Sequence, residues 1–412
     1  MKRTALLLAA TILSASAVAT LAAGLVAYEV VGGRSIPVSL TGKPGDPARG
    51  KVIAADRKLG NCLACHVIPA LADLPFHGDV GPSLAGVAER YSEGELRLWV
   101  VDPKVVNPDT MMPAFYRTEG LYRVMEEFES KPILTAEQVE DLIALLMTLS
   151  GEQTAAGAIR PADEAPEVVK VDPPADSRLS ELISGYYFGI EETRAMQDDD
   201  LLNPGFFWVE RGAELWDEVD GAAGKSCASC HGDAEDSMPG VGASYPKYQE
   251  VAGKVLNLEQ QINQCRSERM QAEPWAFGSD QLLAMSMFVK HQSRGMPVNV
   301  AIDGPAAPFF EQGRAFFHQR RGLLDMTCAH CHNQNYGKML RGDWLSQGHS
   351  NAYPMYALGD ASARPLHKLL WHCNELMRST PFEVLSDEFV NLELFLAWRG
   401  SGLPVEIPGV RW

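Results

Sequence analysis

The chain has 412 residues, of which 46% are hydrophobic, and its formal net charge is −17 at pH 7. This length is enough for about two or three domains, each with its own apolar core. The negative charge argues against nucleic acids and anionic membrane surfaces as partners, because like charges repel. It would suit a basic redox partner, but acidic soluble proteins are common and the charge alone identifies no function.

The N-terminal segment is typical of an exported protein. Met1-Lys2-Arg3 is followed by an uncharged, apolar run at 4–27, which is the pattern of a basic region before a hydrophobic export signal. Ala-x-Ala sites at 15–19 favour a cleaved signal peptide. The run also has the roughly 20 residues that are needed to cross a bilayer, so a retained membrane anchor is the alternative to a cleaved signal. We expect residues 1–27 to place the protein in the periplasm, either free or anchored.

Residues 28–150 have the pattern of one small helical domain. A helix is predicted before Cys62-Leu63-Ala64-Cys65-His66, and Thr135 with Gln138 forms a capping box at the start of another. Apolar residues then recur at helical spacing. They are Val139, Leu142, Ile143, Leu146 and Leu149. Residues 151–177 are rich in Ala, Pro, Glu and Asp without a period, so we expect an interdomain linker.

The rest of the chain contains an internal repeat. Gly212 and Gly313 each lie fifteen residues before the first cysteine of a Cys-x-x-Cys-His motif. Cys265 and Cys373 each follow such a motif, with a leucine seven residues ahead of them. A repeat of this period indicates a duplicated domain.

Three copies of Cys-x-x-Cys-His carry the strongest functional signal. This spacing attaches c-type haem: the two thiols add to the porphyrin, and the histidine binds the iron. Zinc knuckles and disulfides are the alternatives, but three copies use six of the eight cysteines and leave little for a disulfide framework. The sequence therefore predicts three covalently attached haems. Their cysteines and histidines are Cys62, Cys65 and His66; Cys227, Cys230 and His231; and Cys328, Cys331 and His332.

These motifs define the expected fold class. We expect a mostly α protein with three class I cytochrome c-like domains, at 28–150, 178–303 and 304–412.

The ligand on the other face of each iron sets what each haem does. Met112, followed by a proline, is expected to bind the first iron, with Met111 as the spare; both could instead be core methionines. A thioether ligand raises the haem potential. Cys265 and Cys373 are expected to bind the other two irons and to lower their potentials. A Cys265–Cys373 disulfide or two buried thiols are the alternatives.

The motifs resemble a known family. Residues 50–150 resemble SoxX, and residues 184–411 resemble a dihaem SoxA, so the chain resembles both fused in one polypeptide. The SoxX-like stretches are Asn61–His66, Gly78–Leu84, Arg90–Glu93, Val100–Lys104 and Met111–Arg117. The second of them resembles the loop whose proline carbonyl, here that of Pro82, accepts a hydrogen bond from the haem-binding histidine, here His66. The SoxA-like stretches are Asp198–Pro204, Ile262–Arg266, Gln347–Asn351 and Asn391–Leu394.

The resemblance implies an activity. SoxAX proteins join thiosulfate to a cysteine of the SoxYZ carrier as an S-thiosulfonate, in the periplasm, as L-cysteine S-thiosulfotransferases. Cys373 matches the family's active-site cysteine, a distal haem ligand often found as a persulfide, and Cys265 matches the ligand of the other SoxA haem. Arg399 matches a basic residue near the active cysteine, and Lys368 would help it to neutralise the sulfonate. The Met112 haem would then pass electrons to a soluble cytochrome c.

Two positions depart from the family pattern. Many relatives have arginine where this chain has Leu369 and Ala357. Two other functions stay open: a triple-haem electron carrier without covalent chemistry, and a thiosulfate dehydrogenase that forms tetrathionate. Cys373 distinguishes the transferase from the electron carrier, because a plain carrier needs no thiol in the final repeat.

Overall fold

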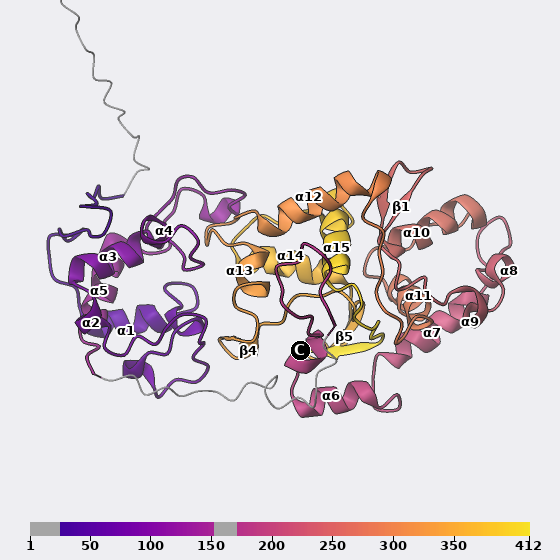
Figure 1. The fold of residues 1–412 in the computed structure, drawn as a ribbon, viewed down its shortest axis with the longest axis horizontal. Coiled ribbons are helices and arrows are strands. Elements are labelled where there is room, and N and C mark those ends of the chain that lie inside the picture. The colour runs from indigo at the N-terminus through magenta and orange to yellow at the C-terminus, as the bar shows by residue number, and fades with distance from the viewer. Residues whose placement is uncertain (1–24, 152–170) are drawn as a thin grey trace, which may run out of the picture.

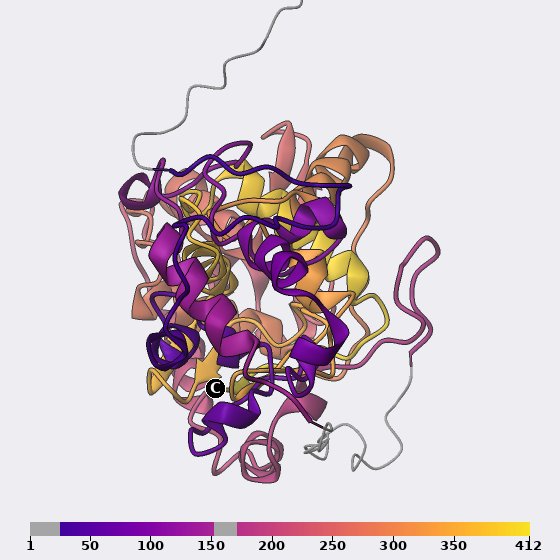
Figure 2. The same ribbon diagram turned by 90° about the vertical axis from the view of Figure 1, so that its left-hand side faces the viewer.

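The computed structural model describes residues 25–151 and 171–412. Residues 1–24 of the expected signal peptide or anchor and residues 152–170 of the linker therefore lie outside the described residues. Within the described ranges, no helix is long and apolar enough to span a membrane. Three helical lobes lie in a row, and the first contacts the third rather than the middle one (Figure 1). In the perpendicular view the first lobe stands in front of the other two (Figure 2).

The first lobe (25–151) holds five α-helices, and its closing helix begins as predicted. Thr135 caps that helix, and the reciprocal bond from Gln138 completes the capping box. The apolar positions predicted for the helix are buried in the core of this lobe. The helices are α1 (Pro47–Ala55), α2 (Val87–Arg90), α3 (Glu93–Val101), α4 (Pro103–Val106) and α5 (Ala136–Leu146).

The middle lobe (about 191–303) has six α-helices and one two-stranded hairpin. A five-residue π-helix, Arg266–Met270, directly follows the helix that ends at Cys265. The helices are α6 (Glu191–Asp198), α7 (Phe206–Asp217), α8 (Ala228–His231), α9 (Ala234–Ser237), α10 (Leu258–Cys265) and α11 (Asp280–His291); the strands are β1 (Lys247–Gln249) and β2 (Lys254–Leu256).

The third lobe (304–412) adds four α-helices and five short strands. In its three-stranded sheet, the central strand pairs antiparallel with one neighbour and parallel with the other. The helices are α12 (Ala307–His318), α13 (Cys328–His332), α14 (Leu366–Leu376) and α15 (Asp387–Arg399). The strands are β3 (Met339–Leu340), β4 (Asp343–Trp344), β5 (Met355–Ala357), β6 (Ser362–Arg364) and β7 (Gly409–Arg411).

One helix crossing recurs in all three lobes, and a glycine makes each crossing close. A Cβ atom on Gly50 would lie 2.2 Å from the Asp141 carbonyl oxygen. A Cβ atom on Gly212 would lie 2.3 Å from the Ala284 carbonyl oxygen, and a Cβ atom on Gly313 would lie 2.0 Å from the Asn391 carbonyl oxygen. The pairs are α1 with α5, α7 with α11 and α12 with α15. The repeat read from the sequence is therefore a repeated packing unit, and the mostly α, cytochrome-like fold class is confirmed.

The two later lobes share one apolar core. Val209 and Leu283 of the middle lobe belong to the same buried cluster as Phe317 and Phe389 of the third. The stretch from Val171 to Leu182 packs near Leu403, so the chain that follows the linker first covers the third lobe.

A substitution at Gly313 tests the crossing. Gly313→Ala should lower the free energy of unfolding by about 1–3 kcal/mol, because the overpacked helices must move apart, although alanine favours a helix by about 1 kcal/mol. Chemical denaturation followed by circular dichroism measures this. Gly359→Ala is the control, since its Cβ would meet nothing within 4 Å. Equal stability of both variants would contradict the close crossing.

Candidate active site

The first Cys-x-x-Cys-His motif presents a histidine already oriented for a ligand. His66 Nδ1 lies 2.7 Å from the Pro82 carbonyl oxygen, and since a carbonyl only accepts, Nδ1 carries the proton and the Nε2 lone pair stays free. A Cβ on Gly81 would lie 2.3 Å from the His66 ring, so the loop is pressed against the imidazole. Burial lowers the pKa of His66 and keeps the ring neutral. The Pro82 contact predicted from the sequence is confirmed.

The third motif repeats the arrangement with different residues. His332 Nδ1 donates to the Ser346 carbonyl oxygen at 2.8 Å, and a Cβ on Gly348 would lie 2.8 Å from the ring. Burial again lowers the pKa of His332. In the middle motif His231 is exposed and stands beside Trp216, with ring centroids 5.8 Å apart. Neutral, oriented imidazoles at the first and third motifs fit c-type haem.

The cysteines are also compatible with haem attachment. All eight are free thiols, so the alternative Cys265–Cys373 disulfide is not formed. Burial raises the pKa of Cys62 and of Cys331 to about 12, so both thiols are protonated at neutral pH.

Each lone cysteine faces the motif of its own lobe. Cys373, on α14, is half-buried, and burial, followed by the nearby Cys328, raises its pKa to about 12. Cys373 in turn raises the pKa of Cys331. Cys265 ends α10 and raises the pKa of Cys227 in the same way. The structure thus brings each of these thiols to the haem motif of its own repeat.

Arg399 and Lys368 do not join Cys373 in one cluster. Arg399 Nη1 donates to Asn333 Oδ1 at 2.7 Å, and Nη2 donates to the Gln347 carbonyl at 2.9 Å. Its guanidinium also lies over Phe317, 4.4 Å from the ring centroid. These partners flank His332 rather than Cys373. Lys368 is exposed, with Nζ 5.1 Å from the Trp371 ring centroid.

A polar cluster around Tyr353, which lies within electrostatic reach of Cys373, was missed by sequence reasoning. The pKa of Tyr353 is raised by burial and by Cys373, and lowered by Arg411 and Arg364, so its hydroxyl lies within electrostatic reach of all three. Both arginines come from the sheet edges: Arg411 is the register partner of Ala357, and Arg364 is that of Met355. Arg364 pairs with Asp360 at 2.8 Å, and Arg411 pairs with Glu406 at 2.6 Å. Strands of three residues carry too little periodicity to predict this cluster.

The two methionines after the first motif have different partners. The sulfur of Met111 accepts a hydrogen bond from Asn335 Nδ2 at 3.2 Å, across the lobe boundary. Met112 packs against the core of the first lobe, and its carbonyl accepts from Lys104 Nζ. Met112 is therefore the one whose side chain stays within the first lobe.

The first and third motifs are neighbours. Cys65 of the first lobe contributes to the raised pKa of Cys331 in the third. The turn between β3 and β4 reaches the first motif, where Arg341 N donates to the Ala64 carbonyl at 2.8 Å. Asp79 N donates to the Met339 carbonyl at 3.0 Å beside it.

Comparison with known proteins places these features in a family. Residues 47–150 match the cytochrome c family model, and residues 211–298 match the model described as SoxA/TsdA, cytochrome c domain. c-type haem, covalently bound, is the cofactor of such domains. A match to a solved structure supports the fold. The structure titled SoxXA from P. pantotrophus superposes with a TM-score of 0.58 at 42% identity, covering 60% of this chain and 93% of that one.

Two curated relatives carry the same enzyme name. The L-cysteine S-thiosulfotransferase subunit SoxA of Rhodovulum sulfidophilum is 46% identical over 57% of this chain and 82% of the relative. That of Pseudaminobacter salicylatoxidans is 42% identical over 60% of this chain and 87% of the relative. The family expected from the motifs is thus confirmed. The chain belongs to the SoxA family of L-cysteine S-thiosulfotransferases and carries a further cytochrome c domain on its N-terminal side.

Proposed function

We propose that this chain joins thiosulfate to a cysteine of a SoxYZ-like carrier protein, with Cys373 as the reacting thiol. Coupling a thiolate to the outer sulfur of thiosulfate forms one S–S bond and releases two electrons. Haem, when bound, supplies one-electron acceptors close to that bond. The observation that carries the proposal is a half-buried thiol, Cys373, beside the third Cys-x-x-Cys-His motif.

The residues around Cys373 have separate proposed roles. Cys373 forms an S–S bond to the outer sulfur of thiosulfate, which releases the two electrons. The carrier thiolate then attacks that sulfur, so the new S–S bond to the carrier forms as the bond to Cys373 breaks and Cys373 leaves as a thiolate. Arg364 and Arg411 favour the sulfonate oxygens electrostatically, in place of the family arginines that the sequence lacks at Ala357 and Leu369. Lys368, exposed on the same helix as Cys373, attracts the anion from solvent. Arg399 acts by holding the His332 segment.

Electrons have a short proposed route out of the site. With haem bound, they would pass from the third motif to the first, because Cys331 and Cys65 are neighbours, and then to a soluble cytochrome c. Met112 would help to hold the haem of the first motif, and a thioether ligand would raise its potential, which would favour transfer in this direction. Cys265 as a ligand in the middle lobe completes a set of three haems.

The same proposal includes the domain limits and the location. We place the domain boundaries at 28–150, 178–303 and 304–412, with the start of the second domain packing on the third lobe through Leu179 and Leu182. Residues 1–27 would direct export to the periplasm. c-type haem attachment needs such a compartment outside the cytoplasm.

Carrier dependence is the decisive test. Reduction of a soluble cytochrome c should require both thiosulfate and the purified carrier, and mass spectrometry should find a thiosulfonate on the carrier cysteine. Reduction by thiosulfate alone, with tetrathionate as the product, would favour the dehydrogenase. No thiosulfate-driven reduction, with intact electron exchange, would favour the simple electron carrier.

The role of Arg399 can be separated from anion binding. Arg399→Gln should change the absorption and the potential of the third haem, because the hydrogen bonds to Asn333 and Gln347 are weakened. Its KM for thiosulfate should change less than about threefold, whereas Arg364→Gln should raise KM by about tenfold, as loss of a charged hydrogen bond does. Steady-state kinetics and redox titration measure these. A raised KM with an unchanged third haem in Arg399→Gln would assign the arginine to the anion instead.

A further inference from the structure

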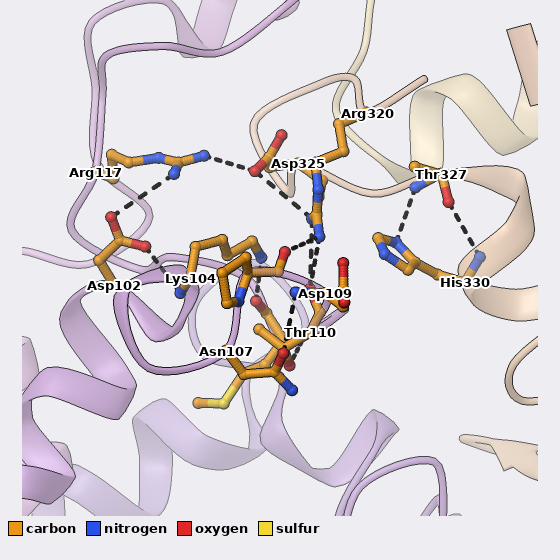
Figure 3. Close-up of polar contacts among 12 residues, drawn as sticks. Asp102, Lys104, Asn107, Asp109, Thr110, Arg117, Arg320, Asp325, Thr327 and His330 are labelled. Carbon is orange, nitrogen blue, oxygen red and sulfur yellow. Dashed lines mark hydrogen bonds and ion pairs between the residues drawn. The ribbon is translucent and has the colours of Figure 1, made fainter. Parts of the chain in front are cut away.

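The loop that carries Met111 and Met112 is held by residues of another lobe. Arg320, just after α12, donates from Nη2 to the Pro108 carbonyl at 2.5 Å and from Nη1 to the Thr110 carbonyl at 3.4 Å. In Figure 3 its guanidinium points into this loop, beside Asn107 and Thr110. A planar guanidinium presents its donors in a fixed fork, so one side chain can hold two carbonyls of a turn in a set orientation.

Arg320 is itself fixed by a network across the lobe boundary. Its Nη1 donates to the Asp325 carbonyl at 2.7 Å. The Asp325 carboxylate, 8% exposed, accepts from Arg117 Nη2 of the first lobe at 2.6 Å. Arg117 also lies 3.7 Å from Asp102, whose side chain accepts from Lys104 N at the start of α4. Arg320 Nη1 also lies 3.7 Å from the Asp325 carboxylate, so both ends of the loop are tied to one buried carboxylate (Figure 3).

Asn335 of the third lobe distinguishes the two methionines. Its Nδ2 donates to the Met111 sulfur at 3.2 Å and to the His330 carbonyl at 2.8 Å. Its Oδ1 accepts from Lys338 Nζ at 2.9 Å, so the amide cannot turn without losing a partner. The sulfur of Met111 is drawn towards the third lobe, while Met112 packs on the first lobe's core.

We propose that Arg320 and Asn335 are positioning residues that select which methionine faces the first haem. Arg320 sets the orientation of the turn, and Asn335 holds Met111 away, so that Met112 is the one available to the iron. The potential of the first haem, from which electrons leave, is thus set in part by residues of the third lobe, which also holds Cys373. This inference rests on the proposed ligation by methionine.

The test uses the full-length haem protein. Methionine bound to ferric haem gives a weak far-red charge-transfer band, and a redox titration gives the potential of the first haem. Met112→Ala should abolish the band, and Met111→Ala should leave it. The double variant Arg320→Gln/Asn335→Ala should keep a band, because either methionine can then bind the iron. Added to Met112→Ala, the same pair should restore it, because Met111 is released. A separate readout is amide hydrogen exchange at 109–112, which should be at least about tenfold faster in the double variant.

The outcomes separate the proposed ligation by Met112 from the proposed positioning role of Arg320 and Asn335. Arg314→Gln on α12 is the control, since Arg314 is half-exposed and pairs with Glu311 within its own helix at 2.5 Å; its band and exchange should match the wild type. If Met112→Ala keeps the band, the ligation by Met112 is wrong. If Met112→Ala loses the band, and adding the Arg320/Asn335 pair neither restores it nor speeds the exchange, the positioning role alone is wrong.

Discussion

Cys373→Ala should abolish carrier-dependent oxidation of thiosulfate, with a loss in rate of about 10³-fold or more, as expected when a covalent nucleophile is removed. Burial raises the pKa of this thiol to about 12, so its reactivity needs a positive centre beside it. The haem iron held by the third motif would be that positive centre, since Cys373 lies near Cys331. Reduction of cytochrome c with thiosulfate and carrier measures the loss.

Cys265→Ala is the matched control for this prediction. Cys265 occupies the equivalent place in the repeat and faces Cys227 in its own lobe. It lies on the lobe farther from the first haem domain (Figure 1), so the variant should keep activity within about tenfold of the wild type. Dithionite reduction should show that the first haem is intact in both variants. Full activity in Cys373→Ala, or equal losses in both variants, would rule out Cys373 as the reacting group.

The same comparison separates the three candidate functions. An electron carrier needs only the potentials of its haems, so Cys373→Ala would shift a potential and leave exchange with a reductant intact. A transferase needs the thiol itself. An extra sulfur atom on Cys373, found by intact-mass analysis of the wild type and absent from the variant, would show that the thiol holds the transferred sulfur.

Local patterns were enough to predict much of this fold. The capping box at Thr135, the spacing of Gly212 and Gly313, and the carbonyl of Pro82 all depend on residues close together in the sequence. A helix start, a repeat and a tight turn have their causes within a few residues. The structure agrees with the sequence at each of these positions.

Contacts between distant segments were beyond sequence reasoning. The partners of Arg399 depend on how the His332 segment folds back over α15, which no local pattern encodes. Arg364 and Arg411 come within electrostatic reach of Tyr353, as Cys373 does, only because three-residue strands pair with each other. The choice between Met111 and Met112 was open for the same reason, because Asn335 comes from another lobe.

Gly348→Ala should strongly impair the third site although it leaves Cys373 in place. Gly348 has a φ of +72°, and an added Cβ would lie 2.8 Å from the His332 ring. The ring has to move, which breaks its hydrogen bond to the Ser346 carbonyl and takes Nε2 off its orientation. Displacements of about 1 Å in a reacting centre can cost 10²-fold in rate, so we expect at least about that loss, with a changed absorption spectrum of the third haem.

Gly278→Ala separates the clash from the strain of the backbone. Gly278 has a φ of +76° and nothing within 4 Å of the added atom, so this variant carries the same left-handed penalty of about 1–2 kcal/mol without touching an imidazole. It should lose stability and keep the spectrum and the rate. Gly81→Ala should reproduce the defect at the first haem, where the Cβ would meet His66 at 2.3 Å. If Gly348→Ala keeps a native third haem and full activity, the glycine does not set the histidine, and the fit of this site to haem loses its main support.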